Sequence, residues 1–142
     1  MQTPLPPYSA ARERLCLLIC TLSLGLCWLY QGLVPKLLGP DAMELQLAQH
    51  ITGSADAALW FARAGGVAEI LFALWLLSGR YVRLALWLSL LAMPALLALT
   101  FWAAPAVLRT AFNPVALNLA MAALAIVGLL HSAPHTPSSN QS

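Results

Sequence analysis

Charged side chains are scarce in this sequence. Lysine, arginine, aspartate and glutamate together make up 8% of the residues, whereas 61% are hydrophobic. In soluble domains roughly a quarter of all residues are charged. A soluble fold with as few charged residues as this sequence would expose large apolar patches. The composition therefore excludes an ordinary soluble domain. The net charge of +2 is also too small and too dispersed to indicate nucleic-acid binding.

Motifs for catalysis are missing as well. The sequence contains no glycine-rich phosphate loop after a strand and no nucleophile motif. Cys16, Cys20 and Cys27 share one helix face, but they form no Cys-x-x-Cys pair and have no histidine on their helix, so we expect packing roles. His131 and His135 are separated by Pro134, which disfavours a metal site. We predict no catalytic residue, no metal site and no cofactor of the chain's own.

Long apolar runs are what the sequence does contain. Each of four segments is long enough to cross a bilayer as a helix. We predict an all-α integral membrane four-helix bundle over residues 12–131, with a flexible proline-rich tail at 1–11 and a disordered tail at 132–142. The four spans are expected at about 15–34, 57–77, 84–104 and 114–130.

A shorter amphipathic helix is expected between the first two spans, at about 41–52. Asp41 and Glu44 have the spacing of an acidic capping box. Met43, Leu47 and Ile51 then recur every four residues and form an apolar stripe. This pattern predicts a helix that lies on the bilayer or caps the bundle.

The distribution of lysine and arginine predicts the orientation. Four spans place both termini on one side, together with the four arginines Arg12, Arg14, Arg80 and Arg83. Lys36 and Arg109 lie in the loops on the opposite side. By the positive-inside rule, we expect a multi-pass protein of the bacterial inner membrane with both termini in the cytoplasm.

Glu69 is a carboxylate near the middle of the second predicted span. A charge at this depth costs a few kcal/mol or more unless it is paired or hydrated, so it is a functional-site candidate. Gly65 and Gly66 lie on the same face of the helix. Small residues allow another helix to approach closely, so we expect packing at these glycines and a Glu69 side chain that points into the bundle.

Arg63 is not an obvious partner for Glu69, because six positions separate them by about 9 Å of rise and about 120° of rotation. Arg63 either snorkels toward the membrane surface or bounds a small polar chamber together with Glu69. Lys36 either anchors its helix at the interface or contributes to the same chamber. The other residues expected around the chamber are Gln31, Asn113 and Asn118. Such a chamber suits a polar headgroup, a quinone carbonyl, an anion or water.

Three short motifs resemble the DoxX-like family of small bacterial membrane proteins. They are the stretch from Trp28 to Lys36, the stretch from Ala64 to Glu69, and Phe112-Asn-Pro114. The resemblance spans about Arg14 to Leu130 and implies a four-helix membrane bundle. Its relatives include small subunits of quinone-linked sulfur oxidoreductases, partners of oxidative-stress complexes, and domains attached to NAD(P)-binding proteins.

The resemblance implies a non-catalytic accessory or anchoring subunit of a membrane redox assembly, with a soluble oxidoreductase partner and a quinone contact. The alternative is a small oligomeric transporter or channel that uses the polar site around Glu69 and Arg63. A third hypothesis, a quinone-reacting enzyme, has little support because the helices carry no haem or flavin ligands. All three hypotheses require the lipid bilayer, and none involves nucleic acid.

Overall fold

The computed structural model describes residues 7–109 and 113–132, and every regular element in these ranges is helical. Four helices are long and apolar enough to cross a membrane, which confirms an all-α membrane protein. The elements are α1 (Pro7–Leu33), η1 (Val34–Leu38), α2 (Ala42–Thr52), α3 (Ala55–Leu77), α4 (Val82–Ala103), η2 (Pro105–Arg109) and α5 (Pro114–His131).

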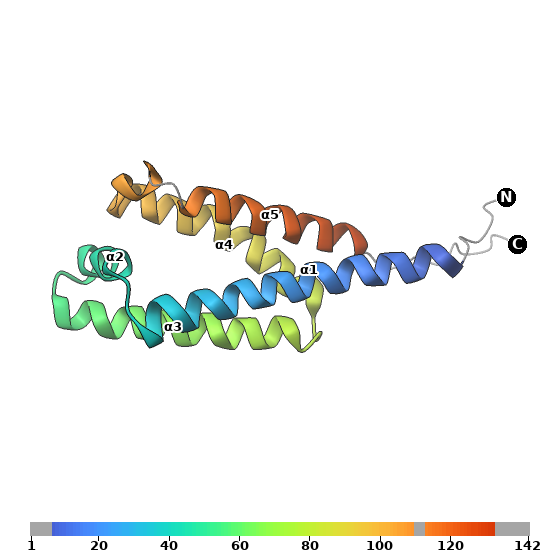
Figure 1. Cartoon of the computed structure of the whole chain (residues 1–142), viewed down its shortest axis with the longest axis horizontal. Coiled ribbons are helices and arrows are strands. Elements are labelled where there is room, and N and C mark those ends of the chain that lie inside the picture. Colours follow the sequence, from blue (N-terminus) through green and yellow to red (C-terminus); the bar gives the residue numbers. More distant parts are fainter. Residues whose placement is uncertain (1–6, 110–112, 133–142) are drawn as a thin grey trace, which may run out of the picture.

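The four long helices form two pairs (Figure 1). Helix α1 packs along α3, and α4 packs along α5, while α1 also contacts α5 and so joins the pairs. Helix α1 begins, and α5 ends, at the same end of the bundle. The short helix α2 lies at the other end, called here the α2 end, where the two pairs diverge.

The core lies between the pairs, in the part of the bundle where all four long helices meet. Leu24, Leu76 and Leu86 come from three different helices and are fully buried. Many other leucines and aromatic side chains are exposed on the outer faces of the helices. Lipid is as apolar as these side chains, so their exposure is the expected arrangement in a bilayer.

Two boundaries of α1 differ from the sequence-based expectation. The helix begins at Pro7 and not near Arg12. Proline is tolerated in the first turn of a helix, where its missing N–H has no intrahelical partner to lose. At its other end the chain does not leave the helix at Pro35 but continues through η1, a π-helical turn to Leu38. The rest of the flexible tail predicted at 1–11 lies outside the described residues, as does nearly all of the disordered tail predicted at 132–142.

The starts of α2, α3 and α5 show which capping signals operate. Asn113 accepts a hydrogen bond from the N–H of Ala116 at 3.1 Å, and Ser54 accepts one from the N–H of Ala57 at 3.2 Å. Both satisfy an N–H that the first turn of a helix leaves free. Asp41, by contrast, makes no side-chain capping bond, so the capping box expected at α2 is not formed.

Candidate functional site

Two glycines allow α1 and α3 to approach each other closely near the α2 end. A Cβ atom added to Gly66 would lie 2.7 Å from the carbonyl oxygen of Gly32 and 2.8 Å from the Cβ atom of Lys36. These separations are too short for any side chain, so the contact requires glycine. Gly65 does not take part, because a Cβ atom there would meet nothing within 4 Å.

The π-helical turn at the end of α1 carries Lys36 over this contact. Pro35 has no N–H and its ring crowds the carbonyl of Gln31, so the normal hydrogen-bond pattern of an α-helix cannot continue through it. The turn widens instead, with the N–H of Gly39 bonded to the carbonyl of Val34 at 3.2 Å. As a result the Lys36 backbone lies against Gly66, one helical turn from Glu69.

Lys36 and Glu69 form a largely buried ion pair. The Lys36 ammonium donates a hydrogen bond to Oε1 of Glu69, and its Nζ also lies 3.8 Å from Oε2 of Glu44 in α2. The side chains of Lys36 and Glu69 are each 13% exposed, and that of Glu44 is 21% exposed. One lysine is thus shared by two carboxylates that come from different helices.

The second oxygen of Glu69 is not used by the protein. Oε2 is buried and has no hydrogen-bond partner among residues 7–109 and 113–132. A buried polar atom without a partner costs roughly 1–3 kcal/mol, and more for a charged group. The carboxylate is therefore only half satisfied by the described residues.

Glu44 lies in α2, outside the spanning helices, and its surroundings shift the pKa of its carboxyl. Burial raises the pKa of its carboxyl above the ordinary value. The nearby Lys36 lowers the pKa, whereas the negative charges of Glu69 and Asp41 raise it further. The net direction is upward, because desolvation outweighs the attraction of the shared lysine.

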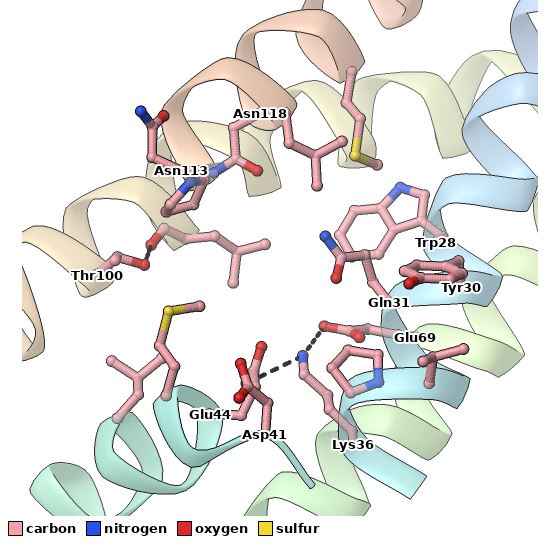
Figure 2. A pocket seen from close by; sticks show the side chains of 18 of the residues that line it. Trp28, Tyr30, Gln31, Lys36, Asp41, Glu44, Glu69, Thr100, Asn113 and Asn118 are labelled. Carbon is pink, nitrogen blue, oxygen red and sulfur yellow. Dashed lines mark hydrogen bonds and ion pairs between the residues drawn. The ribbon is translucent and has the colours of Figure 1, made fainter. Parts of the chain in front are cut away.

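A cavity of about 530 Å³ opens beside the ion pair. Figure 2 shows Gln31, Lys36 and Glu69 on one side of it, and Asn113 and Asn118 across from them. The volume is within the range of small-molecule sites in proteins, roughly 300–1,000 Å³. Polar groups from both helix pairs therefore face one space.

The rest of the lining is largely apolar. Met93 and Leu96 contribute from α4, and Leu117 and Met121 from α5. Apolar walls with a few polar groups are typical of sites for amphiphilic molecules.

Trp28 also lines the cavity and ties the two helix pairs together. Its indole N–H donates to the hydroxyl of Ser89 in α4 at 3.0 Å, and both side chains are buried. The ring therefore faces α4 and finds its hydrogen-bond partner inside the bundle.

Helix α2 covers the cavity at its end of the molecule. Ala48 packs on Ala58 and Ala62 of α3 in a small cluster of buried residues. On the other side, the rings of His50 and Trp102 meet edge to face, with centroids 4.8 Å apart. Helix α2 therefore bridges the two pairs where they diverge (Figure 1).

The structure brings together most of the residues named from the sequence. Glu69, Lys36, Gln31, Asn113 and Asn118 all line the cavity. Glu69 also points toward the other helices, as its small-residue face indicated.

Arg63 lies apart from this group. It is exposed, with its guanidinium 5.8 Å from the centre of the Trp60 ring. The rotation of about 120° between positions 63 and 69 carries it to another face of α3.

Three contributors were not identified from the sequence. Gly32, Asp41 and Glu44 belong to the site, although the sequence pattern assigned Asp41 and Glu44 to helix capping. For Gly32, the available signal was the pairing of a glycine near the end of one span with a glycine in the next. Nothing in the pattern of α2 indicated that Glu44 reaches Lys36.

Among the described residues, no group of three or more histidine, cysteine, aspartate or glutamate side chains is placed to hold a metal ion. The cysteines of α1 are free, and only Cys20 is buried. The cavity lining offers hydrogen bonding and charge, supplied by the ammonium of Lys36 and by carboxylates and side-chain amides.

Comparison with known proteins gives a family. No curated protein and no solved structure is similar enough to the chain to count as a match. A family model does match, and it covers residues 25–126, from the middle of α1 to α5. This range includes both glycines of the helix contact, the π-helical turn and every residue of the ion-pair cluster. The chain belongs to the DoxX-like family.

Proposed function

We propose that this membrane protein binds a small amphiphilic molecule in the cavity at the α2 end, and that it serves as a non-catalytic accessory or anchoring subunit of a membrane redox assembly. The observation that supports ligand binding is the cavity itself, where Glu69 and Lys36 lie beside apolar walls. The redox assignment rests on the relatives that the resemblance to the DoxX-like family implies.

A quinone is one amphiphile of suitable chemistry for such an assembly. Its ring and tail suit the apolar walls, and its carbonyl oxygens accept hydrogen bonds. The side-chain amides of Gln31 and Asn118 are donors that line the cavity from opposite walls. A short-chain quinone should bind the wild type more tightly than Asn118→Leu. Gln46→Leu is the matched control, since Gln46 is exposed on α2 and does not line the cavity.

Purification in mild detergent tests the accessory role. A tagged chain should recover a soluble oxidoreductase, and a tagged membrane protein of unrelated sequence should not. Recovery of the chain alone, repeated at low detergent and at low salt, would count against an accessory subunit.

A transporter or channel is the second candidate function. It is favoured by one observation, a buried ionisable pair beside a cavity within a spanning bundle, because such residues often mark substrate pathways. Arg63 contributes nothing to this cavity, so the candidate depends on Glu69 and Lys36. Flux into liposomes that is unchanged by Glu69→Gln would remove it. Cross-linking in the same liposomes tests the homo-oligomer.

We also propose that the protein lies in the bacterial inner membrane with both termini in the cytoplasm. Four arginines lie at the end of the bundle that holds the termini, against Lys36 and Arg109 at the other, and the excess of positive residues marks the cytoplasmic side. Of two reporters fused after α5, one that works only in the cytoplasm should be active and one that works only in the periplasm should not. Activity of a periplasmic reporter at this position would reverse the orientation.

A further inference from the structure

The charge of the cavity lining is strongly unbalanced. Asp41, Glu44 and Glu69 place three carboxylates on it, and Lys36 is its single ammonium among the described residues. The sequence contains 7 lysines and arginines and 5 aspartates and glutamates, and every one of them lies within residues 7–109. The residues outside the described ranges therefore hold no lysine or arginine that balances the cavity.

This imbalance selects the sign of a ligand. Asp41 is exposed, whereas the side chains of Glu44 and Glu69 are only 21% and 13% exposed. Negative charge at these two poorly solvated positions is costly unless an opposite charge compensates it. Lys36 already pairs with Oε1 of Glu69 and lies 3.8 Å from Oε2 of Glu44. Its positive charge is therefore already compensated, and it attracts an anionic ligand only weakly. An anionic ligand would meet three carboxylates, whereas a cation would reduce the net negative charge.

The carboxylates on the lining select the kind of polar group. A carboxylate oxygen is an acceptor only, so Glu44 and Glu69 need donors from the ligand. A primary ammonium supplies three donors together with the required charge, and hydrogen bonds of this type are about twice as strong as neutral ones. The amide oxygens of Gln31 and Asn118 are further acceptors on the lining.

The remaining lining suits the rest of such a molecule. Met93, Leu96 and Met121 offer apolar surface, and two aromatic residues, Trp28 and Tyr30, also line the cavity. Aromatic rings attract cations that lie within about 6 Å of the ring centre. A volume of about 530 Å³ accommodates a ligand of one or two rings.

We propose that the cavity binds a hydrophobic organic cation, a primary amine whose ammonium group is held by Glu69 and Glu44 and whose apolar body lies against α4 and α5. The inference rests on the proposed role of the cavity as a ligand site and is independent of any redox assembly. It differs from the quinone contact because a quinone carbonyl is an acceptor and needs donors.

A matched series of probes tests the proposal on the full chain in nanodiscs of zwitterionic lipid. The probes are 1-naphthylmethylammonium, 1-naphthylmethanol and 1-naphthylacetate, which share one ring system and carry a cation, a neutral donor and an anion. Binding is measured by equilibrium dialysis, with empty nanodiscs subtracted. The ammonium should bind roughly tenfold more tightly than the alcohol, equivalent to about one charge-assisted hydrogen bond, and the acetate should not bind.

Variants then locate the binding. Glu69→Gln should weaken ammonium binding about tenfold or more, since it removes the charge and keeps the shape. Asp56→Asn is the matched control, because Asp56 is an exposed carboxylate on the same helix and outside the cavity. Lys36→Met should bind the ammonium more tightly, because the competing cation is gone. If Lys36→Met does not fold, Glu44→Gln, expected to weaken binding several-fold, takes its place.

The binding results distinguish failure of the cation proposal from failure of the proposed function. If the alcohol or a quinone binds in a Glu69-dependent way and the ammonium does not, the cavity is a ligand site and the cation proposal is wrong. If no probe binds above empty nanodiscs, the cation proposal is overturned, while co-purification still decides the accessory role. Loss of ammonium binding in a folded Lys36→Met variant would also overturn it.

Discussion

Gly32 and Gly66 lie against each other where α1 meets α3, so closely that a Cβ on Gly66 would lie 2.7 Å from the carbonyl oxygen of Gly32. The same contact brings the backbone of Lys36 next to α3 and so within reach of Glu69. The helix contact and the ion pair are therefore one structural feature. Changes to the glycines should alter the site as well as the stability.

Gly66→Ala should destabilise the protein by about 1–3 kcal/mol, the usual range for inserting a methyl group into a tightly packed contact. Gly65→Ala is the control on the adjacent position, where added atoms meet no neighbour within 4 Å. Alanine also favours the helix, so this control should be neutral or stabilising by up to about 1 kcal/mol. Thermal unfolding in detergent measures both, and equal melting temperatures for the two variants would contradict the contact.

Lys36→Met should cost about 3 kcal/mol or more, because it leaves the buried Glu69 carboxylate without its cation. Adding Glu69→Leu should recover much of this loss, since an apolar pair replaces the isolated charge. Arg63→Met is the control, and as an exposed residue it should change stability by less than about 0.5 kcal/mol. Chemical denaturation of the four proteins gives the comparison; a similar cost for Lys36→Met and Arg63→Met would refute the buried pair.

Trp28→Phe and Ser89→Ala should each destabilise the bundle, and their effects should not add. Both variants remove the same hydrogen bond of 3.0 Å, so the double variant loses it only once. We expect a coupling free energy of about 1 kcal/mol, the usual net contribution of such a bond. Additive effects in a double-mutant cycle would show that the two side chains act independently.

The raised pKa of Glu44 makes the stability of the protein depend on pH. The folded pKa lies above the unfolded one, so the contribution of Glu44 to stability is fully present below the unfolded pKa and is lost as the pH rises through the folded pKa. Glu44→Gln should remove this loss. Between about pH 4 and about pH 8, the melting temperature of the wild type should therefore fall relative to that of the variant.

Asp56→Asn serves as the control for this experiment, because Asp56 is an exposed carboxylate outside the cavity. Its difference from the wild type should not follow the same pH course. A wild type that gains stability relative to Glu44→Gln as the pH rises would mean that attraction to Lys36 outweighs burial at this site.

Composition and periodicity were sufficient for the fold class and for the approximate position of each helix. Long apolar runs with few charges have one stable form in a bilayer, since each backbone group must find its partner within its own helix. The same local signals identified Asn113 as a cap and Glu69 as a residue that faces the bundle. These properties depend on neighbours within a few positions along the chain.

The partners of Glu69 depend on contacts between segments that are distant in the sequence. Lys36 is 33 residues away from Glu69, and it arrives there only because α1 turns π-helical at Pro35 and because two glycines let the helices touch. Glu44, which the pattern of α2 assigned to capping, joins them because α2 covers the cavity. Sequence patterns over a few neighbouring residues cannot give the distances in space of Lys36 and Glu44 from Glu69. The sequence therefore indicates a buried carboxylate, and the packing of the helices determines which charges surround it.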